Sequence, residues 1–208
     1  MDDKKIIALV IGGVILFVGF LFLLGHFSQP KPVVPIQTLT DSSALPGMQV
    51  GNAPWAPELS HLLERLKAIH LPALSQEGTA LHIHQHLDLY INGKSVAVPP
   101  EIGISTSFIS PIHVHDTSGI IHVESPTVQT FTLGQFFDIW GVRFTSQCIG
   151  GYCANANSTL AVYVDGKLYS GDPRQLSLAP HQEIVITYGT DTQLPNPIPS
   201  TFAFPAGY

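Results

Sequence analysis

The sequence predicts an α+β fold, mostly antiparallel β, in which a single-pass transmembrane anchor carries one β-rich domain with two short helices. Three observations lead to this fold class. An uncharged apolar run occupies residues 6–24, and apolar and polar residues alternate with a period of two in several later stretches. The dipeptides Asn92-Gly93 and Asp165-Gly166 follow such alternating stretches. Period-two alternation is typical of half-buried strands, and these dipeptides are typical of hairpin turns.

The apolar run predicts a membrane anchor over residues 1–27. A helix of 19 residues spans about 28 Å, which is close to the thickness of a bilayer's hydrocarbon core. The run ends at Phe27 without the small-residue pattern of a cleavage site, so we expect a retained anchor rather than a signal peptide. Lys4 and Lys5 precede it, which favours a cytoplasmic N-terminus and an extracytoplasmic domain at the cell membrane.

A linker and a single domain are expected after the anchor. Residues 28–57 contain six prolines among Ser, Thr, Gln and Gly, which predicts an extended, poorly packed linker. Trp55 within it is expected to rest on the bilayer interface or on the domain. The length of residues 58–208 suits one domain. The net charge of −6 comes without any basic stripe, so nucleic acid is excluded as a partner.

Two helices are predicted in the domain. The first covers residues 57–70 and ends before Pro72. Its apolar residues recur at helical spacing and form one stripe: Leu59, Leu62, Leu63, Leu66 and Ile69. The second begins at Thr132, which forms a capping-box pattern with Gln135, and ends at Gly141. Four large apolar residues in five positions predict that this second helix is almost fully buried.

The remaining elements are predicted to be strands joined mainly by tight turns. They are residues 79–91 and 94–98 around Asn92-Gly93, a hairpin over residues 112–124 around residues 116–119, residues 161–164 and 167–169 around Asp165-Gly166, and a last strand over residues 183–188. Between them lie Cys148 and Cys153, whose close spacing predicts a loop disulfide outside the cytoplasm. The alternative interpretation makes them a pair of soft metal ligands.

Histidines are concentrated on two of these predicted elements, since six of the ten lie between His82 and His122. On a strand, residues two apart project from the same face, so the first strand presents one row. In the hairpin, facing residues have numbers that sum to 235, which places His113 opposite His122. The candidate metal ligands are His82, His84, His86, His113, His115, His122 and Glu124.

Imidazole and carboxylate groups of this kind suit a divalent transition metal, namely Zn, Cu or Ni. Alternate residues on a strand lie about 6.7 Å apart, so two imidazoles can converge on one ion, whereas three cannot easily do so. We therefore expect two ligands from the first strand and one or two from the hairpin, or two separate sites with His82 or His86 outside the ligand set. The alternative is a pH-responsive histidine network without metal.

These patterns favour a membrane-anchored extracytoplasmic protein that binds a divalent transition metal and holds it for a membrane-protein partner. The first alternative is a metal-dependent hydrolytic enzyme, because three histidines with an open position hold catalytic zinc. The second is a structural or assembly subunit of an envelope complex.

Three longer motifs carry a resemblance to a known family. They are HIHQHL at residues 82–87, PIHVHDTSGIIHVESP at residues 111–126 and FTLGQFFDIWG at residues 131–141. Together they resemble an uncharacterised family of His-rich bacterial envelope proteins, over about residues 66–208. The resemblance implies a bacterial origin and a coherent domain, and it carries no known activity.

Overall fold

The computed structural model describes residues 42–208, all of which belong to one structural unit. The predicted anchor over residues 1–27 and the first part of the predicted linker lie outside the described residues. Among residues 42–208, no helix is both long enough and apolar enough to cross a bilayer. The described part of the chain is α+β and mostly antiparallel β, with two α-helices, as the sequence predicts.

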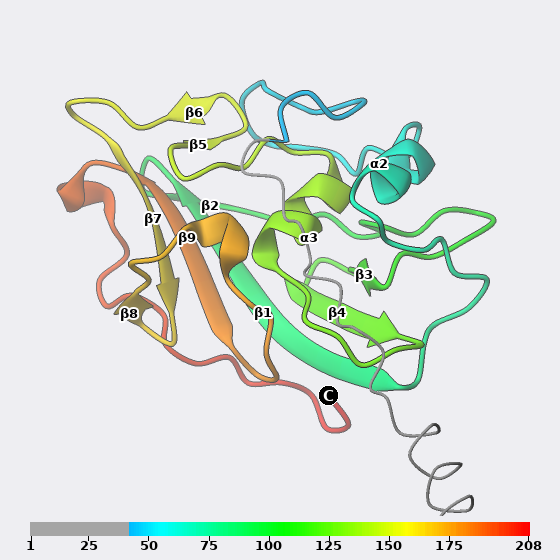
Figure 1. Cartoon of the computed structure of the whole chain (residues 1–208). Helices are drawn as coiled ribbons and strands as arrows, with labels where there is room; N and C mark the ends of the chain where they lie inside the picture. The colour runs from blue at the N-terminus through cyan, green and yellow to red at the C-terminus, as the bar shows by residue number, and fades with distance from the viewer. Residues whose placement is uncertain (1–41) are drawn as a thin grey trace, which may run out of the picture. The chain divides into compact units, whose positions relative to one another are not determined.

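A seven-stranded sheet forms the centre of this unit, with β1 as its long middle strand (Figure 1). The order is β3-β4-β1-β9-β7-β8, and β2 pairs with the far end of β1. The strands are β1 (Leu81–Ile91), β2 (Lys94–Val96), β3 (Ile112–His113), β4 (Ile120–Ser125), β7 (Thr159–Val164), β8 (Lys167–Leu168) and β9 (Glu183–Gly189). A separate two-stranded sheet pairs β5 (Cys148–Ile149) with β6 (Tyr152–Cys153).

One pairing in the large sheet is parallel. Strand β9 runs alongside β1 over six residue pairs, from His86 opposite Glu183 to Ile91 opposite Tyr188. On its other edge β9 pairs with β7 in the antiparallel sense. The sequence predicts the last strand but not its partner, because the two strands are separated by most of the domain.

Helix α3 (Leu133–Trp140) packs in front of the sheet and supplies much of the core (Figure 1). All eight of its residues are buried. Its N-terminus carries the predicted capping box, with both reciprocal hydrogen bonds between Thr132 and Gln135. Its C-terminus is Gly141 at φ 79°, a left-handed conformation that a residue without a Cβ adopts at low cost. The predictions for this helix are confirmed.

Helix α2 (Leu62–Ala68) is shorter than the predicted helix over residues 57–70. Leu62, Leu66 and Ile69 of the predicted stripe are buried, whereas Leu59 and Leu63 are among the most exposed apolar residues. The helix also carries Arg65, which is fully buried and which the sequence pattern does not mark. The guanidinium of Arg65 donates to the backbone carbonyls of Asp138 and Ile139 at the end of α3, and to the carboxylate of Glu58.

The prediction of a poorly packed linker up to residue 57 is wrong for residues 42–57. Trp55 is only 3% exposed and lies edge-on to Trp140 at 6.0 Å between ring centres. The backbone N–H of Gln49 donates to the carbonyl of Gly141, and a carbonyl of Pro46 accepts from Arg65. Apolar burial and these hydrogen bonds outweigh the extended tendency of the prolines, so the domain begins upstream of residue 58.

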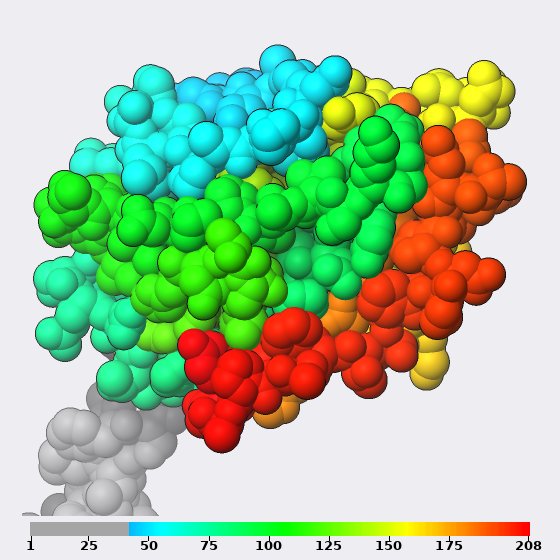
Figure 2. All heavy atoms as spheres, turned by 180° about the vertical axis from the view of Figure 1, so that it is seen from behind, coloured from blue at the N-terminus to red at the C-terminus, as the bar shows by residue number. Residues whose placement is uncertain are grey.

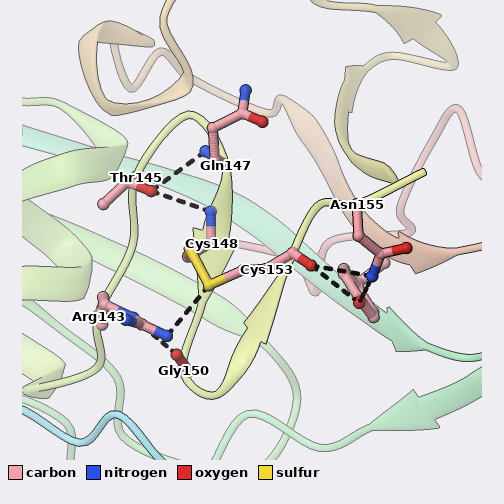
Figure 3. The surroundings of a disulfide bond; sticks show 8 residues. Arg143, Thr145, Gln147, Cys148, Gly150, Cys153 and Asn155 are labelled. Atoms are coloured by element: carbon pink, nitrogen blue, oxygen red, sulfur yellow. Dashed lines mark hydrogen bonds between the residues drawn. A yellow bond between two sulfur atoms is a disulfide. The ribbon is translucent and has the colours of Figure 1, made fainter. Parts of the chain in front are cut away.

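Cys148 and Cys153 form a disulfide, as predicted, and face each other across the β5–β6 hairpin (Figure 3). Arg143 lies beside the bond, where it donates to the Sγ of Cys153 at 3.3 Å and to the carbonyl of Gly150 at 2.8 Å. A disulfide leaves no thiolate to bind an ion, so the alternative interpretation of these cysteines as metal ligands is wrong.

Candidate metal centre

Strands β1, β3 and β4 bring the histidines together through their register. In the β3–β4 hairpin, His113 lies directly opposite His122, which is the pairing expected from the sequence. Strand β1 lies antiparallel to the other edge of β4, with His84 opposite His122 and His82 opposite Glu124. Directly paired residues on adjacent strands point to the same face, so all of these side chains gather on one face of the sheet.

The first arm of the cluster, as we call His82 and His84, comes from β1. The Nε2 atoms of these two histidines lie 3.1 Å apart. The Oε1 atom of Glu124 lies 3.2 Å from the Nε2 of His82 and 3.2 Å from the Nδ1 of His122. One donor atom from each of the four side chains lies within 4.8 Å of the other three. Tetrahedral coordination with bonds of 2.0–2.1 Å would place ligand atoms about 3.3–3.4 Å apart, so the spacing suits an ion.

The second arm, His113 and His115, comes from β3 and the turn that follows it. Its Nε2 atoms also lie 3.1 Å apart. The Nδ1–H of His113 donates to the carbonyl of Ser110 at 3.0 Å, which leaves the lone pair on Nε2, facing the cluster. Metal-binding histidines are commonly oriented by such a bond from their other nitrogen. This arm forms a second group of close donor atoms with His122 and Glu124, which also belong to the first group. We call His122 and Glu124 the shared pair.

Glu77 is a carboxylate of the cluster that the sequence analysis misses. Its Oε1 lies 3.4 Å from the Nε2 of His115 and 4.0 Å from the Nε2 of His113. The next residue, Gly78, lies so close to the backbone of Ser125 that a Cβ would come within 2.1 Å of it. Only glycine permits this approach, which holds Glu77 against the hairpin. Glu77 stands in a loop without periodicity, so no pattern in the sequence singles it out.

His86 turns away from this cluster, although it belongs to the same row on β1. Its Nδ1 lies 2.8 Å from a carboxylate oxygen of Glu183, and its Nε2 donates to the carbonyl of Ser118 at 2.9 Å. The ring stacks on Phe202 at 3.7 Å between centres. Its donor atoms form a separate group with Asp88 and Glu183. Because both ring nitrogens already have partners, His86 has no lone pair directed at the other histidines.

Burial keeps the inner histidines neutral. It lowers the pKa of His84 and of His113 to about 4, and the pKa of His122 to about 3, with repulsion from neighbouring histidines adding to the effect. These imidazoles are therefore unprotonated at pH 7 and have lone pairs to offer. Burial also raises the pKa of the Glu124 carboxyl, and the nearby carboxylate of Glu77 raises it further.

The centre is open on one side and partly covered on the other. The side chains of His82 and His115 are 53% and 42% exposed. The ring of Tyr208 lies 4.6 Å from that of His84 and 5.5 Å from that of His122, and its carbonyl accepts from the Nε2 of His181. The last residues of the chain lie on the side of the sheet seen in Figure 2, which is opposite to α3.

The described residues therefore contain histidine and glutamate groups close enough to hold a metal ion. The structure brings together six of the seven candidate ligands, His82, His84, His113, His115, His122 and Glu124, and separates His86 from them. Comparisons of the chain with protein-family models, with curated proteins and with solved structures find no match in any of the three. The resemblance to bacterial envelope proteins stays a prediction.

Proposed function

We propose that this chain is a membrane-anchored extracytoplasmic protein whose domain binds a divalent transition metal, Zn(II), Cu(II) or Ni(II), in the histidine cluster. The observation that carries the proposal is the convergence of the first arm on the shared pair. Four donor atoms from adjacent strands lie within 4.8 Å of one another, and distances of 3.1 Å, 3.2 Å and 3.2 Å among them are close to the spacing of a tetrahedral shell. Because they stand on paired strands of the central sheet, little reorganisation is needed when an ion binds.

Neutral, buried imidazoles favour a metal site over a pH-responsive network. Histidines that switch charge near pH 6 need pKa values near 6, whereas burial holds those of His84, His113 and His122 at about 4 or below. A metal ligand has the opposite requirement, because it must be unprotonated at the working pH. The hydrogen bond from His113 to Ser110 also fixes the tautomer that a ligand needs.

The donor set selects the class of metal. Nitrogen and carboxylate oxygen suit Zn(II), Cu(II) and Ni(II), and no thiolate is offered since the two cysteines are joined. The disulfide also supports a domain outside the cytoplasm, because such bonds persist in oxidising compartments. The apolar run at residues 6–24 supports attachment to the membrane.

A binding titration tests the proposal. The full chain in detergent micelles, stripped with a chelator, is titrated with Zn(II), Cu(II) and Ni(II) at pH 7.5, followed by calorimetry and elemental analysis. We expect at least one ion per chain for the parent, and at least a 100-fold loss of affinity at the site between the first arm and the shared pair when His84 and His122 are both changed to alanine. This double substitution removes two of the four ligands of that site.

The matched control is His70→Asn. His70 is exposed, lies outside every close group of donors among the described residues, and adopts φ 58°, which asparagine tolerates. This variant should bind as the parent does, which separates the cluster from general histidine content. A parent chain that retains no metal after loading and gel filtration at pH 7.5 would refute the proposal.

A further inference from the structure

Resting on the proposed function, we infer that the cluster is a two-metal centre. One ion lies between the first arm and the shared pair, and the other lies in the second arm with Glu77. The carboxylate of Glu124 stands between the two ions and serves both. The proposed function requires only one bound ion and no ligand from Glu77. The inference adds a second ion and makes Glu77 one of its ligands.

The number of converging donors exceeds what one ion can use. A tetrahedral shell takes four ligands, and zinc expands to about five. The cluster offers seven side chains: the two arms, the shared pair and Glu77. A single ion would therefore use at most about five of these side chains, and at least two that converge on the cluster would not be ligands. Two ions leave none of the seven without a role.

The two arms approach the shared pair from separate sides. The ring centre of His122 lies 4.5 Å from that of His84 and 4.6 Å from that of His115. The ring planes meet nearly edge-on, at 84° and 87°. Two ligand atoms on one ion can be at most about 4.2 Å apart when its bonds are about 2.1 Å. The donor atoms of both arms do not all lie within 4.8 Å of one another, a separation above this limit, and each close group contains one arm and the shared pair.

Glu77 supplies a ligand to the ion bound by the second arm, so this ion does not need His122 to reach four ligands. Its Oε1 lies 3.4 Å and 4.0 Å from the two Nε2 atoms of the second arm, and the Oε1 of Glu124 lies 4.0 Å from the Nε2 of His113. The second ion then has His113, His115, Glu77 and Glu124. The first has the first arm, His122 and Glu124. Each ion thus receives four donors, and paired ions about 3.5–4 Å apart are a recurring arrangement in proteins.

The position of the two carboxylates agrees with this arrangement. The Oε1 atoms of Glu77 and Glu124 each lie 4.0 Å from the Nε2 of His113. An ion bound by the second arm would therefore have a carboxylate from each of these residues beside it, and its charge would offset their mutual repulsion.

The test counts ions and asks whether they are close. The full chain in detergent micelles is loaded with Zn(II) or Cu(II), separated from free metal and analysed for metal per chain. We expect two ions per chain in the parent and one in Glu77→Gln, and we expect the Cu(II) form of the parent to show magnetic coupling that Glu77→Gln lacks. Glu77 is half exposed, so this variant should fold, which a melting curve checks. Glu64→Gln, on the exposed side of α2, is the matched control and should retain two ions.

The outcomes separate this inference from the proposed function. One ion per chain in the saturated parent overturns the two-metal centre and leaves metal binding intact. Two Cu(II) ions without magnetic coupling overturn the shared carboxylate, because the ions would then lie in separate sites. Two ions in Glu77→Gln overturn the role of Glu77. A parent that holds no metal refutes both proposals.

Discussion

Acid should destabilise the metal-free domain steeply, because three buried histidines must take up protons when it unfolds. In the folded chain the pKa values of His84 and His113 are about 4 and that of His122 is about 3. In the unfolded chain all three lie near 6.5. Between these limits the unfolded chain binds more protons, so the free energy of unfolding is fully present above about pH 6.5 and falls as the pH drops towards 4.

The size of the effect follows from proton counting. Each proton taken up on unfolding contributes about 1.4 kcal/mol per pH unit, so three give a slope that approaches about 4 kcal/mol per pH unit near pH 5. A domain with a stability of about 5–15 kcal/mol would lose most of it within a few pH units. The assay is urea unfolding in the presence of a chelator, at half-unit steps from pH 7.5 to 4.5.

A variant identifies the histidines as the source of this slope. His113→Asn keeps a donor for the carbonyl of Ser110 but takes up no proton, so the slope should fall by about a third. His70→Asn, at an exposed position outside the cluster, is the matched control for the substitution itself. A free energy of unfolding that stays level from pH 7 to pH 5 would show that the cluster is not held neutral by burial, and the reasoning above would fail.

Two further predictions concern stability and topology. Arg174→Ala should lower the free energy of unfolding by about 3–5 kcal/mol in urea titrations, because the carboxylate of Asp138 loses a buried partner at 2.8 Å. A loss below about 1 kcal/mol would contradict this role. An enzyme reporter fused after Tyr208 should be active only if it requires an extracytoplasmic location. Activity of a reporter that works only in the cytoplasm would refute the proposed orientation.

Local patterns were sufficient to predict much of the fold and of the site. The capping box at Thr132, the two Gly-containing turns and the pairing of His113 with His122 each depend on residues close together in the sequence. The spacing argument also anticipated that a row of three histidines on one strand would not converge, and His86 is the one set apart. In these cases a short stretch of chain contains both partners of the interaction.

The features that the sequence analysis did not predict depend on residues far apart along the chain. The parallel pairing of β1 with β9 joins residues almost a hundred positions apart, and strand periodicity carries no information about that choice. Arg65 is buried only because the end of α3 offers it carbonyls. Glu77 enters the centre because Gly78 lets two backbone segments touch. The proline-rich sequence before residue 57 is typical of a linker, and only the burial of Trp55 shows that this stretch packs on the core.

Strand β1 carries the candidate ligands on one face and core residues on the other, and this limits which changes in length it can accept. Its first histidines alternate with Leu81 and Ile83, which pack against the core, and the same face continues with the buried Leu87. Deleting or inserting one residue inside the strand would shift every later side chain to the opposite face. Histidines would enter the core and leucines would enter the centre. Single substitutions along β1 change one contact each, whereas insertions and deletions there disrupt the fold and the centre together.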